Sequence, residues 1–139
     1  MKRAVAFGDP QSTTKLAVDA LLAATSRWPG ATSATVLPAT APGGAAPLVV
    51  TRFEYWEAQT LQTVGFARLR LLVWSDDADE AWDVASYLHG LLLASSGDAD
   101  HSGYLYRTGP GRATDPDYGT PLSAFVVVAK MRAQPIAIA

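Results

Sequence analysis

The clearest pattern of apolar and polar positions in this sequence covers residues 66–93. From residue 66 to 74 the side chains alternate, with Leu69, Leu71 and Val73 on one side, which predicts a strand with one face on a core. The next acidic residues, Asp77 and Glu80, have the spacing of a helix N-cap and its capping box. Apolar residues then recur at helical spacing, and this stripe consists of Ala78, Ala81, Trp82, Ala85, Leu88 and Leu92.

A second helix is predicted near the start of the chain, over about residues 10–27. Asp9 followed by Pro10 is a typical helix start, because the carboxylate caps the helix and proline fits its first turn. Pro29 and Gly30 mark the end. The apolar residues that repeat at helical spacing are Ala17, Ala20, Leu21, Ala24 and Trp28, with Val18 and Leu22 beside them.

The remaining periodic segments predict strands at residues 33–37, 48–56, 104–108 and 121–132. In the segment 48–56, an alternating pattern is expected to place Phe53 and Tyr55 on one face and Arg52 and Glu54 on the other. This strand is expected to pair with 64–74 as an antiparallel hairpin. Two segments rich in Gly and Pro, about 38–47 and 109–119, are expected to be flexible loops.

The order of the predicted elements is α-β-β-β-α-β-β. Adjacent strands between two helices indicate an α+β fold, with an antiparallel or mixed β-sheet and both helices packed on one face. A length of 139 residues fits one domain, so residues 1–139 are predicted to form a single α+β domain.

Composition narrows the classes of partner. Charged residues make up 17% of the chain, below the usual quarter or so, which leaves more of the surface suited to contact with other chains. A net charge of −2 argues against sequence-specific nucleic-acid binding and against an anionic membrane surface. The chain has no cysteine, so disulfides and thiolate zinc sites are excluded. The apolar runs are too short to cross a membrane, and a soluble protein, intracellular or part of a particle, is expected.

Catalytic and metal-binding patterns are weak. His89 is expected at the edge of a helix stripe, and His101 follows two acids in a turn without a second histidine at ligand spacing. The acids from Asp76 to Glu80 lack the glycine and the distal glutamate of a calcium loop. We therefore expect no enzyme activity, no cofactor and no metal.

Arginine and aromatic residues on the predicted strands are candidates for a protein interface, where both are enriched. We predict a basic and aromatic patch on the sheet, an acidic partner patch in the late loop, and an apolar contribution from the C-terminal segment. The candidate residues are Arg52, Arg68, Arg70, Trp74, Arg112, Asp115, Asp117, Tyr118, Ile136 and Ile138.

The segments ARLRLLVWSDDADEAWDVASYLHGLL and PLSAFVVVAKMR, with an N-terminal helix followed by tryptophan, resemble the tail-terminator proteins of long-tailed bacteriophages. The resemblance implies an α+β subunit that forms a homo-oligomeric ring, a hexamer in this family. Such a ring caps the tail tube, ends tube polymerisation and offers a surface to the head-tail connector protein. It also implies a place at the head-proximal end of the virion tail, after assembly in the host cytoplasm.

Two other functions remain open from the sequence. One is a head-completion or head-tail connector protein, which ring stoichiometry and tube binding would distinguish. The other is a small enzyme or ligand-binding domain, which requires a concave polar pocket with convergent titratable groups.

Overall fold

The computed structural model describes residues 5–37, 46–59, 64–98 and 101–135. Its elements, in chain order, are β1 (Val5–Phe7), α1 (Pro10–Ala23), β2 (Thr32–Ala34), β3 (Leu48–Gln59), β4 (Val64–Trp74), α2 (Ala78–Ala94), β5 (His101–Thr114) and β6 (Pro121–Pro135). The expected order is confirmed from α1 onward. The short first strand was not predicted.

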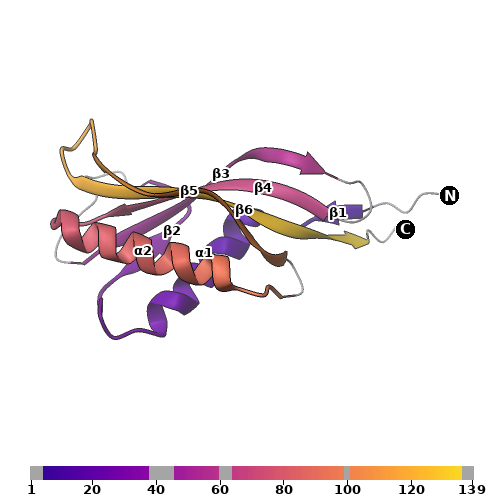
Figure 1. Ribbon diagram of the computed structural model, residues 1–139, viewed down its shortest axis with the longest axis horizontal. Coiled ribbons are helices and arrows are strands. Elements are labelled where there is room, and N and C mark those ends of the chain that lie inside the picture. The colour runs from indigo at the N-terminus through magenta and orange to yellow at the C-terminus, as the bar shows by residue number, and fades with distance from the viewer. Residues whose placement is uncertain (1–4, 38–45, 60–63, 99–100, 136–139) are drawn as a thin grey trace.

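The six strands form one mixed sheet, with the path β1-β6-β4-β3-β2 and with β5 also paired to β6. Only the pairing of β2 with β3 is parallel; the others, including the predicted β3–β4 hairpin, are antiparallel. Both helices lie on the same side of the sheet (Figure 1). The predicted α+β fold is therefore confirmed. We call the side under the helices the covered face and the other side the open face.

The main core lies between the helices and the covered face. Alternate residues of the central strands point into it, as the sequence pattern predicts for β4. The strand residues buried there include Leu69, Leu71, Val73, Phe125 and Val127, and the helix residues include Val18, Leu22, Val84, Ala85, Leu88 and Leu92. Burial of this apolar surface is the dominant favourable term for the fold.

Helix α2 begins as predicted, but its hydrogen bonds differ from a capping box. The Asp77 carboxylate accepts from the Asp79 N–H at 2.9 Å. Glu80 instead accepts from the Ser75 hydroxyl, which itself accepts from the Asp77 N–H. The predicted buried stripe is rotated slightly. Val84 lies in the core, whereas Ala78 is exposed and Trp82 is only half-buried.

Helix α1 is shorter than predicted and faces the core with a different set of residues. Asp9 caps it and Pro10 occupies its first turn, as expected, but the helix ends at Ala23. Its buried residues are Pro10, Thr14, Val18 and Leu22. Trp28 is buried beyond the end of the helix, where its ring meets Tyr87 of α2 edge-on at 5.2 Å.

Strand β3 contains two β-bulges, which reverse the expected facing of its aromatic residues. Glu54 is an extra residue between the pairs Phe53↔Leu69 and Tyr55↔Arg68, and Glu57 is a second one farther along. Each extra residue shifts the alternation by one position. Tyr55 therefore lies on the open face, contrary to the prediction. Trp56 packs into the core against Phe7 and Phe53.

The prediction of a loop at residues 109–119 is wrong for the first half of this segment. Residues 109–114 continue β5, which pairs with β6 up to Thr114↔Pro121. Glycine and proline in this segment suggested a loop, but Pro110 lies at a break in register where no ladder hydrogen bond is required of it. Residues 38–45, most of the other predicted loop, lie outside the described residues.

Candidate functional site: the open face of the sheet

The open face buries apolar residues although no described helix covers it. Val50, Val126 and Val128 are at most 1% exposed, yet they alternate with the core-facing residues of β3 and β6. Long charged side chains from the neighbouring strands extend over this face. Arginine stems cover apolar surface well, because the methylene groups lie on the surface while the charged end stays in water.

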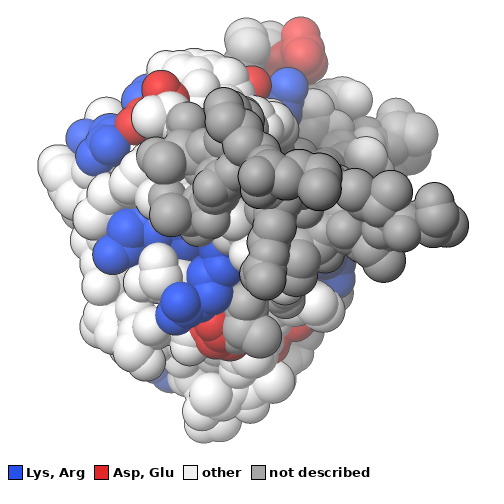
Figure 2. Space-filling model, turned by 90° about the vertical axis from the view of Figure 1, so that its right-hand side faces the viewer, with Lys and Arg blue, Asp and Glu red and all other residues white. Residues whose placement is uncertain are grey.

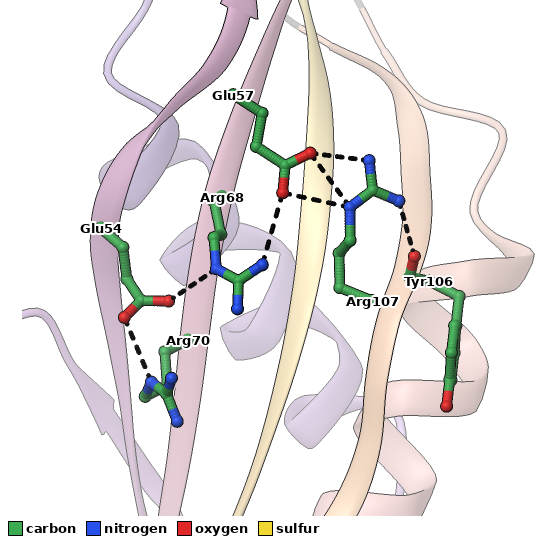
Figure 3. Close-up of polar contacts among 6 residues, drawn as sticks. All are labelled: Glu54, Glu57, Arg68, Arg70, Tyr106 and Arg107. Atoms are coloured by element: carbon green, nitrogen blue, oxygen red, sulfur yellow. Dashed lines mark hydrogen bonds and ion pairs between the residues drawn. The ribbon is translucent and has the colours of Figure 1, made fainter.

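These charged side chains form one continuous network, in which three arginines alternate with two glutamates (Figure 3). Arg107 Nη2 lies 2.7 Å from Glu57 Oε1, and Arg68 Nη1 lies 3.4 Å from Glu57 Oε2. Arg68 Nε also lies 3.2 Å from Glu54 Oε1, and Arg70 Nε lies 3.3 Å from Glu54 Oε2. The network thus joins β3, β4 and β5 across the width of the sheet.

Three members of the network occupy bulges. Glu54 and Glu57 are the extra residues of β3, and Arg107 is the extra residue of β5, between Tyr106↔Val127 and Thr108↔Val126. A bulge redirects a side chain that regular alternation would place elsewhere. This is why sequence alternation does not reveal Glu57 as the carboxylate that Arg68 and Arg107 share.

Hydrogen bonds within the network favour the ionised forms of Glu57 and Arg107. Hydrogen bonds from Arg107 hold the pKa of the Glu57 carboxyl below its ordinary value, and the same bonds raise the pKa of Arg107. Arg52 lies on the same face, directly across from Arg70, and is exposed. In the described part of the chain Arg52 has no ion-pair partner. Together with the five members of the network, Arg52 makes four arginines against two glutamates, so these six residues carry an excess of two positive charges.

A shallow hollow of about 330 Å³ on this face is lined by Arg52, Phe53, Glu54, Tyr55 and Arg70. Tyr55 is 53% exposed, and the Arg68 guanidinium lies 5.6 Å from the centre of its ring. Arginine and tyrosine are the residues enriched where protein interfaces gain most of their binding energy. The predicted basic patch is thus assembled around Arg52 and Arg70, with Tyr55 added.

Trp74 does not belong to that patch. Its side chain is 2% exposed, and its Nε1–H donates to Asp115 Oδ2 at 2.9 Å. Asp115 is also buried. The sequence predicts Trp74 in the basic and aromatic patch and Asp115 in the acidic partner patch, but the structure joins them within one subunit. Indole N–H groups require a partner when they are buried, which explains this pairing.

The other predicted interface residues are divided between two regions. Arg112 points to the helix side, where it pairs with Asp79 at 2.7 Å and lies over the Trp82 ring. Asp117 and Tyr118 are exposed on the turn between β5 and β6. Ile136 and Ile138 lie outside the described residues.

Both edges of the sheet are poorly suited to strand addition. Beyond Val50, the outer side of β3 has no neighbouring strand in the described residues, and it carries both bulges. There the Phe53 N–H donates to the Gln11 side chain of α1 at 2.7 Å. On the opposite edge, β5 has three breaks in register and contains Pro110. Bulges, proline and covering side chains are the devices by which proteins prevent edge pairing. Contacts through side chains are therefore favoured over strand pairing.

The two histidines have local contacts. His89 packs against the rings of Phe125 and Tyr106, and partial burial lowers its pKa. His101 is buried, and its Nδ1 accepts from the Gly103 N–H. Among the described residues, no three His, Cys, Asp or Glu side chains are grouped so that they could hold a metal ion. Within the same residues, no helix is long and apolar enough to span a membrane.

On one side of the molecule the charged side chains that can be seen lie in small groups. Figure 2 shows the side of the molecule that is on the right in Figure 1, where Lys and Arg side chains form separate groups with Asp and Glu nearby. This visible surface has no continuous basic area of the kind that tracks a nucleic-acid backbone.

The chain matches no protein-family model and no curated protein.

Proposed function

We propose that this protein is a structural component of a bacteriophage tail. Copies of the chain form a ring, a hexamer as in the tail terminators that the sequence resembles, which caps the tail tube. The ring ends tube polymerisation and provides the surface that the head-tail connector binds. In the virion it lies at the head-proximal end of the tail.

The open face of the sheet is the observation that carries this proposal. It exposes arginine and tyrosine around a shallow hollow, on a surface where, in the described residues, charged side chains take the place of a covering helix. Such a surface fits a polar protein interface better than a catalytic cleft. The hollow is near the lower limit of small-molecule pockets, and its lining contains no histidine, serine or cysteine. These features favour an assembly protein over a small enzyme.

The test adds the purified protein to polymerising tube protein of the phage that encodes it. We expect tube growth to stop, and labelled protein to be found at one end of each tube by electron microscopy. Native mass spectrometry of the released caps is expected to show a closed ring. Unchanged tube growth, with no label at tube ends, would reject the proposal. Binding to the portal or connector complex with no effect on tubes would favour the connector role instead.

A further inference from the structure

The turn between β5 and β6 has a fixed shape. Asp115 Oδ1 accepts from the backbone N–H groups of Asp117 at 2.8 Å and Tyr118 at 3.2 Å. Its backbone N–H donates to the Thr120 carbonyl, and its own carbonyl accepts from Gly119. Gly119 has a φ of 70°, a conformation that suits glycine. The bond from Trp74 to Asp115 Oδ2 anchors the turn to the end of β4.

This turn presents an aromatic ring and a carboxylate to solvent. Tyr118 is 47% exposed, and Asp117 is exposed without an ion-pair partner in the described residues. Because the backbone is already held in place, a partner that binds these two side chains pays little entropy for ordering the turn. Rigid aromatic side chains on a fixed loop are effective anchors in protein recognition.

The hollow on the open face is complementary to this turn. It lies between β3 and β4, whereas the turn extends from β5 and β6 on the other side of the strand order. The hollow combines Tyr55 with Arg52, which has no ion-pair partner in the described residues, beside the Glu54–Arg70 pair. The turn combines Tyr118 with the negative charge of Asp117. A second copy of this chain thus supplies the group that each surface lacks.

We propose that the Asp117 and Tyr118 turn of one copy binds in the hollow of the next copy. The Asp117 carboxylate pairs with Arg52, and the Tyr118 ring packs between Tyr55 and Arg70. The contact joins two different surfaces head to tail, and repetition of such a contact closes a ring when the rotation between copies allows it. This inference rests on the proposed function, because it assigns the contact between subunits of that ring.

The test uses charge reversal in the full chain. Arg52→Glu and Asp117→Arg are each expected to weaken self-association at least about tenfold, because each places like charges together. In an equimolar mixture of the two variants, a ring in which they alternate contains only native pairs and reversed pairs. The mixture is therefore expected to assemble again. Self-association is measured by sedimentation in solution and by native mass spectrometry of caps from tube ends.

Matched controls come from the helix side, where exposed Arg27 and Asp83 lie 4.0 Å apart. Arg27→Glu and Asp83→Arg make the same changes in net charge and are expected to assemble normally. Tyr118→Ala, which changes no charge, is expected to weaken self-association without lowering the thermal midpoint. Circular dichroism of each variant checks that the fold is retained.

Any other outcome would contradict the proposed contact between the turn and the hollow. If both reversed variants assemble like wild type, the turn and hollow do not meet, while normal capping by wild type would leave the proposed function intact. If Asp117→Arg loses tube capping but still self-associates, the turn binds the tube protein instead. If wild type stays monomeric both in solution and on tubes and never caps them, the contact and the proposed function fail together.

Discussion

The two faces of this sheet bury neighbouring residues by different means. Val127 and Val128 are adjacent in β6 and both fully buried, but Val127 lies under the helices and Val128 lies under arginine and glutamate side chains. Apolar packing under helices is dense and does not readily rearrange. A cover of charged side chains is held instead by partly exposed ion pairs, which water and salt weaken. The difference indicates that the covered face holds the fold, and that the open face is the one suited to binding.

The largest effect is expected in the core of the covered face. Phe125 is 1% exposed, so Phe125→Ala should lower the free energy of unfolding by about 3–5 kcal/mol, through lost burial and the cavity left behind. Denaturant unfolding monitored by fluorescence measures this loss. A cost below about 1 kcal/mol would mean that Phe125 contributes little to the core, and would contradict the view that the covered face holds the fold.

A matched pair of valines compares the two faces directly. Val127→Ala removes the same two carbon atoms as Val128→Ala from a position of equal burial. We expect a cost of about 2–3 kcal/mol for Val127 and about 1–1.5 kcal/mol for Val128, since long arginine side chains can fill part of the gap more easily than a packed helix can. Equal costs in chemical denaturation would show that the charged cover is as rigid as the helices.

A smaller, pH-dependent effect is expected at the anchored turn. The hydrogen bond from Trp74, followed by the backbone N–H of Asp117, holds the pKa of Asp115 below its ordinary value. The bond therefore stabilises the fold above the ordinary carboxyl pKa of about 3.9, and this contribution is lost as pH falls through the folded pKa. Trp74→Phe should be less stable than wild type at neutral pH.

Thermal unfolding of wild type and Trp74→Phe across a pH series measures this effect. The gap between the two proteins should narrow in strong acid, once Asp115 is protonated in the folded protein. A constant gap at every pH would assign the effect to packing rather than to the hydrogen bond.

The smallest effect is expected in the charge network. Glu57→Gln removes the carboxylate shared by Arg107 and Arg68, and it should cost about 0.2–1 kcal/mol because the pairs are partly exposed. The cost should shrink in about 1 M salt, where screening is strong. Phe125→Ala serves as the control, with a loss that salt does not reduce. A cost for Glu57→Gln that salt leaves unchanged would indicate a packing role for Glu57.

The sequence predicts the parts of the fold that depend on local patterns. Regular alternation located β4, and Asp9 and Asp77 located the helix starts. The three residues of β1 escaped prediction because their strand exists only through pairing with the distant end of β6. A segment of three residues carries too little periodicity to indicate a strand.

The candidate site was only partly predictable, because bulges determine it. Arg52 and Arg70 were assigned to the correct face, since they lie in the regular part of the hairpin. Glu57 and Arg107 are extra residues at bulges, and no periodic pattern places an extra residue. The alternation correctly places Trp74 on the open face. Its burial could not be predicted, because it depends on contact with Asp115, which is 41 residues away in the sequence.

The interrupted edges of the sheet have a consequence for the chain on its own. When many copies of a chain are present, a sheet with long open edges favours disordered stacking into fibres. The Gln11 side chain on Phe53, the bulges of β3 and Pro110 in β5 each interrupt the row of backbone groups that such growth needs. These interruptions protect the free chain from amyloid-like aggregation.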